Sequence, residues 1–138
     1  MQISDNTHFV IAGCGAMGLP MALKLKEHAF SVSGFDVRPP ADFDHVDLPM
    51  PQALSIDSAD TVLMLVVRDA QQCRDVCFER QAVFNQPVYP QVLVVSSTVS
   101  PRLIDELRAR LPDDVVLIDA PMSGAGYSAQ AGTLTFMV

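Results

Sequence analysis

The chain has 138 residues, of which 49% are hydrophobic and 18% charged, a size and composition that indicate one globular domain. Its formal charge of −7 leaves few cations to neutralise phosphates, so we expect neither nucleic acid nor a membrane as a partner. No apolar run approaches the roughly 20 residues of a membrane span. The three cysteines lack the companions of a metal site, and this favours reduced thiols in a cytoplasmic protein.

The first predicted strand covers residues 8–13, an almost wholly apolar run of the kind that is buried on both faces of a sheet. A helix is predicted from Ala16 onward, because four apolar residues recur at every fourth position and would form its buried face. These residues are Met17, Met21, Leu25 and Ala29.

The rest of the chain continues the alternation of strands and helices. The later predicted strands cover residues 31–36, 60–67, 92–97, 115–120 and 133–138. The later predicted helices cover residues 51–57 (a weak, short pattern), 69–80 and 100–111. Ser100 is expected to cap the last helix, with Pro101 at its first position. This alternation favours an α/β fold, in which helices cover both faces of a parallel sheet through right-handed crossovers.

A G-x-G-x-x-G motif, Gly13-Cys14-Gly15-Ala16-Met17-Gly18, lies between the first predicted strand and the first predicted helix. In this position the motif is typical of a dinucleotide-binding turn in a Rossmann-type, doubly wound sheet. Gly13 would permit the tight turn, Gly15 would let a pyrophosphate approach the backbone, and Gly18 would let the helix pack closely on the sheet. We therefore expect these six residues to bind NAD. A glycine-rich turn without a ligand explains one glycine well and all three poorly.

Asp36 ends the second predicted strand, where a carboxylate can accept hydrogen bonds from the ribose hydroxyls of a dinucleotide. Its charge would repel a 2′-phosphate, so NAD is favoured over NADP. The alternative is that Asp36 only caps a loop. Arg38 leaves the cofactor choice open, because it can stack on adenine, bind a 2′-phosphate or remain solvated.

Two further stretches join the glycine motif in a pattern that spans the chain. They are SSTVSP at residues 96–101 and DAPMSGAGYSAQAGTLTFMV at residues 119–138. The combination resembles the β-hydroxyacid dehydrogenase family, which includes 3-hydroxyisobutyrate, tartronate semialdehyde, threonate and 6-phosphogluconate dehydrogenases. The stretch MLVVRDAQQ at residues 64–72 resembles the threonate-dehydrogenase-like branch.

The resemblance implies roles for individual residues outside the glycine motif. Leu65 and Val66 would border the riboses of the cofactor, and Thr98 would lie near the nicotinamide ribose. Ser123 and Gly124 would bind the carboxylate of the substrate through a hydroxyl and backbone N–H groups. The structural alternatives are that Thr98 helps to cap a helix and that Ser123 and Gly124 form only a turn.

The resemblance also implies an all-helical second domain that supplies a lysine as general acid/base. Residues 1–138 are then expected to be the dinucleotide-binding domain alone, without a catalytic residue and without turnover. The implied reaction is hydride transfer between NAD and a small hydroxy acid, either an aldonate or a 3-hydroxy acid, in a homo-oligomer. Two other functions stay open: an NAD-binding or sensing module without turnover, and a relative of the imine reductases.

Overall fold

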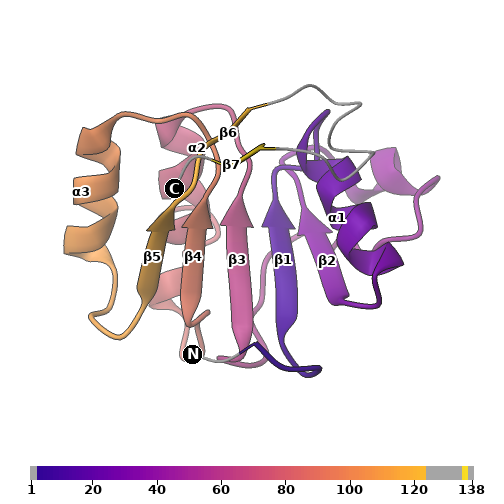
Figure 1. Cartoon of the computed structure of the whole chain (residues 1–138), viewed down its shortest axis with the longest axis horizontal. Coiled ribbons are helices and arrows are strands. Elements are labelled where there is room, and N and C mark those ends of the chain that lie inside the picture. Colours follow the sequence, from indigo (N-terminus) through magenta and orange to yellow (C-terminus); the bar gives the residue numbers. More distant parts are fainter. Residues whose placement is uncertain (1–2, 124–134, 137–138) are drawn as a thin grey trace.

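The computed structural model describes residues 3–123 and 135–136. Five parallel strands form one sheet in the order β2-β1-β3-β4-β5 (Figure 1). The strands are β1 (His8–Ala12), β2 (Ser31–Phe35), β3 (Thr61–Leu65), β4 (Val92–Val95) and β5 (Val116–Asp119). From β1 the chain adds β2 on one side and then β3, β4 and β5 on the other, which is the doubly wound arrangement of a Rossmann-type fold. The predicted fold class is confirmed.

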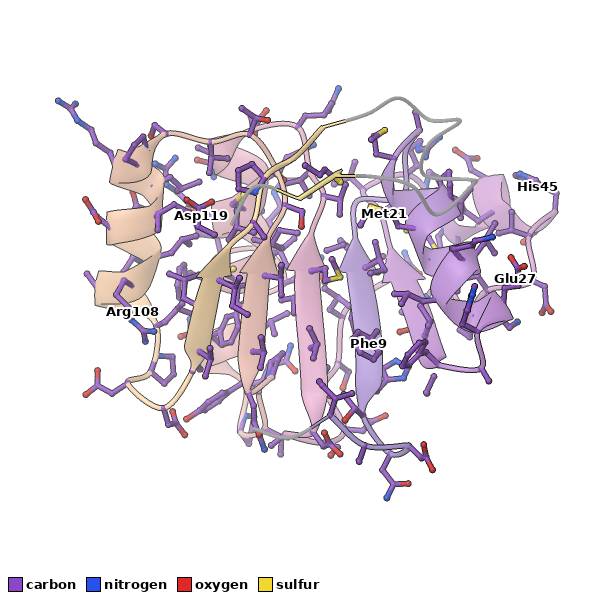
Figure 2. All side chains as sticks on the ribbon, in the orientation of Figure 1. Phe9, Met21, Glu27, His45, Arg108 and Asp119 are labelled. Atoms are coloured by element: carbon purple, nitrogen blue, oxygen red, sulfur yellow. The ribbon has the colours of Figure 1, made fainter. Side chains whose placement is uncertain are left out.

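The two faces of the sheet carry separate apolar clusters. The helices are α1 (Gly18–Glu27), α2 (Ala70–Cys77) and α3 (Pro101–Arg110), with single 3₁₀ turns η1 (Pro40–Phe43) and η2 (Val83–Asn85). Ile11 and Val32 pack with α1 on one face, and Phe9 of β1 lies on this same face (Figure 2). Leu63 and Leu93 pack with α2 and α3 on the other. Because strand side chains alternate between faces, the central strands β1 and β3 are apolar along most of their length.

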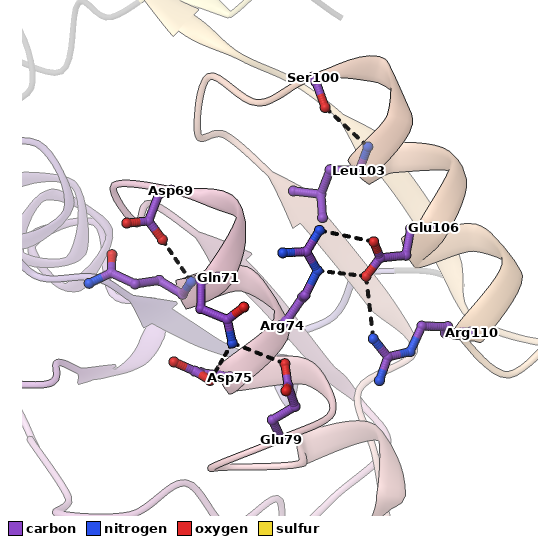
Figure 3. A network of polar contacts seen from close by, with 10 residues as sticks. Asp69, Gln71, Arg74, Asp75, Glu79, Ser100, Leu103, Glu106 and Arg110 are labelled. Atoms are coloured by element: carbon purple, nitrogen blue, oxygen red, sulfur yellow. Dashed lines mark hydrogen bonds and ion pairs between the residues drawn. The ribbon is translucent and has the colours of Figure 1, made fainter.

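Helices α2 and α3 are also joined by charged side chains (Figure 3). Arg74 of α2 donates two hydrogen bonds to Glu106 of α3, at 2.7 and 3.0 Å, and Arg110 reaches the same carboxylate at 3.3 Å. The predicted cap of α3 is confirmed, because the Ser100 hydroxyl accepts a hydrogen bond from the Leu103 N–H and Pro101 follows it.

The buried face of α1 differs from the predicted one. Gly18, Met21 and Ala22 are its buried residues, and the predicted Leu25 is only half-buried. Ala29 lies beyond the helix with a φ of 67° and is exposed. The helix begins at Gly18, which packs against the carbonyl of Gly13, and its buried face therefore runs from Gly18 to Met21 and Ala22.

Residues 51–57 form no helix, so that prediction is wrong. Leu54 and Ile56 are buried with the α2 and α3 cluster, an alternation that belongs to extended chain. The Leu54 N–H donates to Oε1 of Gln81 at 2.8 Å, and the Ile56 N–H donates to Oε1 of Gln86 at 3.2 Å. These glutamines are distant in sequence, and they satisfy the backbone groups that a helix would otherwise pair internally.

The predicted last strand does not join the parallel sheet. Its described part, β7 (Thr135–Phe136), pairs antiparallel with β6 (Met122–Ser123), a strand that the sequence pattern did not predict. Pro121 lies between β6 and β5, whose pairing with β4 extends to the Ala120 N–H. The described residues of the predicted last strand pair with β6 and not with the main sheet.

Candidate dinucleotide-binding site

A pocket of about 330 Å³ lies where the carboxyl ends of β1, β2 and β3 meet. The turn after β1 contributes Gly13 and Gly15, the segment after β2 contributes Asp36 and Arg38, and the segment after β3 contributes Val66. The order of the strands reverses at β1, and open α/β sheets bind their ligands at such a switch point.

The three motif glycines serve different purposes. Gly13 has a φ of 100°, and a Cβ at this position would overlap the carbonyl of Val66. A Cβ at Gly18 would overlap the carbonyl oxygen of Gly13, whereas its nearest sheet atom, in the Ile11 side chain, is 3.5 Å away. A glycine is therefore needed at position 18 because of the close contact with the turn at Gly13, and not because of the contact with the sheet. A Cβ at Gly15 would meet no atom within 4 Å, so packing does not explain this glycine.

The N-terminus of α1, at the end of the glycine turn, is a position where an anion can bind. Among the described residues no side chain caps this end of the helix, and its first turn contains no acidic residue. The first turn of α1 therefore places no negative charge against the positive end of the helix dipole. Together with the open position at Gly15, this arrangement fits a bound pyrophosphate.

The other residues of the motif do not line the pocket. The Cys14 side chain is buried, and its thiol donates to the carbonyl oxygen of Ile11 at 3.4 Å. Burial raises the pKa of this thiol to about 11, so it is inert at neutral pH. Ala16 is exposed and Met17 is the N-cap of α1. Any contact of Cys14, Ala16 or Met17 with a cofactor stays a prediction.

Asp36 is held in place by three N–H donors. Its Oδ2 accepts from the Cys14 N–H at 2.8 Å, and its Oδ1 accepts from the backbone N–H and the Nε of Arg38 at 3.0 and 3.1 Å. Burial alone would raise the pKa of the carboxyl, but these donors and the guanidinium charge hold it below its usual value. Asp36 is therefore an ionised acceptor at the edge of the pocket.

Leu65, the last residue of β3, does not line the pocket, whereas the residues that follow it do. Leu65 is fully buried in the cluster with α2 and α3, and the pocket is lined instead by Val66 and Val67. The Val66 N–H donates to the carbonyl oxygen of Ala12 at 2.8 Å, which ties this wall to the end of β1. Arg68 also lines the pocket.

Serines at the end of β4 support this wall. The buried Ser97 hydroxyl accepts from the Val67 N–H at 2.8 Å and donates to the carbonyl oxygen of Leu65 at 3.2 Å. The Ser96 hydroxyl is buried and has no hydrogen-bond partner among the described residues. Thr98 is exposed and does not line the pocket. The motif SSTVSP pointed to this region, but reasoning from sequence singled out Thr98 and missed the bridging role of Ser97.

The expected substrate residues lie at the limit of the described chain. Ser123 belongs to β6, where its backbone pairs with Thr135, and Gly124 lies outside the described residues. The two lysines of the sequence, Lys24 and Lys26, are on α1 and do not line the pocket.

Within residues 3–123 and 135–136, no three His, Cys, Asp or Glu side chains gather in a way that could hold a metal ion. Over the same residues, no helix has the length and apolar character needed to span a membrane. All three cysteines are free and buried.

The family model described as the NAD binding domain of 6-phosphogluconate dehydrogenase matches residues 8–138. L-threonate dehydrogenase from Cupriavidus necator is 33% identical over 133 residues, which cover 92% of this chain and 44% of that protein. Mitochondrial 3-hydroxyisobutyrate dehydrogenase from Bos taurus is 28% identical over 99% of this chain and 42% of its own length.

A solved structure of Mycobacterium tuberculosis 3-hydroxyisobutyrate dehydrogenase with L-serine is similar in fold, with a TM-score of 0.79 and 26% sequence identity. That similarity covers 95% of this chain and 45% of the other. The chain thus spans less than half the length of these relatives. Because the family match extends from β1 to the last residue, the chain belongs to the family of NAD-binding domains of 6-phosphogluconate dehydrogenase.

Proposed function

We propose that this chain binds NAD(H) in the pocket between β1, β2 and β3, and that the whole protein transfers hydride between that cofactor and a small hydroxy acid. The observation that carries the proposal is the position of Gly15, where a side chain would meet only the open pocket. The expected cofactor fits the residues present, because Gly15, in the turn before α1, and the ionised Asp36 carboxylate line the same pocket.

Each element of the pocket has a defined role in this proposal. The turn at Gly15 and the N-terminus of α1 would hold the pyrophosphate, and Asp36 would orient the adenosine ribose. Val66 would form the wall beside the riboses, and Thr98 would lie toward the nicotinamide. When bound, the nicotinamide supplies the hydride acceptor. The protein's share is to fix that ring relative to the substrate and to exclude water.

The substrate class follows from the relatives. Those compared above are named for the oxidation of threonate and 3-hydroxyisobutyrate, and one solved structure contains L-serine, which has a hydroxyl group on the carbon next to the α-carbon. We propose an aldonate or a 3-hydroxy acid, with Ser123 and Gly124 at its carboxylate. Neither lysine of this chain lines the pocket, so we place the proton-transferring lysine in a part of the protein outside these 138 residues.

The activity is tested on the whole protein with NAD and a panel of threonate, glycerate and 3-hydroxyisobutyrate, by the formation of NADH. Turnover with one of these acids supports the dehydrogenase. Binding of NADH without turnover of any hydroxy acid would instead favour a sensing module, and turnover of imines alone would favour the imine reductase.

The cofactor preference is tested on Asp36. The unmodified chain is expected to bind NADH more tightly than NADPH, and Asp36→Ala should narrow the difference by weakening NADH about tenfold, since a charge-assisted contact to the ribose is lost. Calorimetric titration measures both affinities. Asp42→Ala, which removes an exposed carboxylate from η1 outside the pocket lining, is the matched control. Equal affinities of the unmodified chain for the two cofactors would refute the role of Asp36.

We also propose that the chain associates with a second copy through the side of the sheet on which α1 lies. Ile11, Met64, Val94 and Ile118 form one register row across that face. Ile11 is fully buried, whereas the other three are only half-buried, and Val116 on the edge strand β5 is 46% exposed. Among the described residues, α1 covers only the β1 and β2 half of this face (Figure 1).

Apolar rows that stay only half-buried, next to an exposed residue such as Val116, promote association. Light scattering is expected to show a dimer at high protein concentration, and Val116→Lys should shift it toward the monomer without changing the circular dichroism spectrum. An unmodified chain that stays monomeric at all concentrations would contradict the proposed interface.

Three reduced, buried thiols agree with our proposal that the whole protein is cytoplasmic.

A further inference from the structure

We propose that Arg38 controls the choice between NAD and NADP by competing with the cofactor for Asp36. It occupies the carboxylate that would otherwise bind the ribose hydroxyls, and it lies beside the position at which a 2′-phosphate would enter. This inference rests on the proposed function, because it assigns the adenosine end of the cofactor to the edge of the pocket that Asp36 forms.

The Asp36 carboxylate has little acceptor capacity left. Each carboxylate oxygen has about two lone-pair sites. Oδ1 already accepts two N–H groups of Arg38, one from the backbone and one from Nε, and Oδ2 accepts the Cys14 N–H. One lone-pair site on Oδ2 is therefore open to a ribose hydroxyl. For the second hydroxyl to reach Oδ1, the Nε of Arg38 must first leave it.

The Arg38 side chain can leave Asp36 without leaving the pocket. It is about half exposed (51%), and an ion pair in contact with water is weak enough for a ligand to displace it. A second anchor is the carbonyl oxygen of Cys14, to which Arg38 donates at 2.9 Å. The guanidinium also lies 4.7 Å from the ring centre of the buried Phe43, which gives it a fixed apolar platform.

The displaced guanidinium is suited to a 2′-phosphate. Arginine binds phosphate oxygens through two parallel N–H groups, and its charge offsets the repulsion between the phosphate and Asp36. With NAD, which lacks the 2′-phosphate, we expect the same side chain only to compete with the ribose for the carboxylate. Arg38 is thus expected to weaken NADH binding and to strengthen NADPH binding. The pocket contains one further lining arginine, Arg68, which is the rival partner for the phosphate.

The test compares four proteins by calorimetric titration with NADH, NADPH and 2′-AMP: the unmodified chain, Arg38→Ala, Arg38→Lys and Arg68→Ala. Arg38→Ala should bind NADH about twofold to fivefold more tightly and NADPH at least about tenfold more weakly, because a charged hydrogen-bond partner of the phosphate is lost. Binding of 2′-AMP should weaken in parallel with NADPH. Arg38→Lys keeps the charge, so it should recover most of the NADPH affinity.

Arg102→Ala is the matched control, since it removes an exposed arginine from the first turn of α3, away from the pocket lining. Its affinities for both cofactors should equal those of the unmodified chain. Equal changes in NADH and NADPH affinity in Arg38→Ala, or a loss of NADPH binding in Arg68→Ala alone, would overturn the role of Arg38. If the unmodified chain binds neither cofactor, the proposed function itself fails.

Discussion

Gly15→Val is expected to abolish dinucleotide binding while the domain stays folded. A side chain at this position contacts no atom of the chain within 4 Å and enters the pocket where the pyrophosphate would lie. Its backbone is outside the left-handed region, so valine brings no strain of the kind that glycine relieves. Losing two charge-assisted hydrogen bonds to the phosphates corresponds to an affinity loss of about 100-fold or more.

Fluorescence titration with NADH measures the loss, and circular dichroism and thermal unfolding report on the fold. Ala41→Val is the control, because Ala41 is exposed on η1 and does not line the pocket. It adds a similar apolar volume away from the glycine turn. An unchanged NADH affinity in a natively folded Gly15→Val chain would show that the phosphates do not bind at this turn.

Gly18→Ala is expected to have the opposite profile, a loss of stability. The added Cβ would overlap the carbonyl oxygen of Gly13, a backbone atom in a turn that cannot give way without moving β1 or α1. Overpacking of this kind should lower the free energy of unfolding by about 2 kcal/mol. For a domain of this size, that corresponds to a fall in melting temperature of roughly 5–10 °C.

Urea unfolding followed by circular dichroism measures this change. The sign of the result is decisive, because alanine is favoured over glycine within a helix by about 1 kcal/mol. If the contact with Gly13 were unimportant, Gly18→Ala would therefore stabilise the protein. The two variants together separate the glycine that the ligand requires from the glycine that the turn requires.

Features that depend on neighbouring residues were predictable from the sequence. The five strands of the main sheet follow from short apolar runs, and the start of α3 follows from the local pair Ser100 and Pro101. The position of the glycine turn, between β1 and α1, was also predicted correctly. In each case the pattern itself lies within a few consecutive residues, even though the partner strands are distant, so the chain contains the necessary information.

The tertiary structure decided the features whose partners are distant in sequence. Residues 51–57 are extended because Gln81 and Gln86 bind their backbone, and the described part of the predicted last strand pairs with β6 instead of the main sheet. The motif G-x-G-x-x-G predicted a cofactor site. It did not show that Gly18 packs against Gly13, or that Arg38 donates a hydrogen bond to the carboxylate of Asp36. Sequence spacing determines which residues can share an element. The packing of separate elements determines which donors, acceptors and carbonyl groups meet, and here that packing sets the geometry of the pocket.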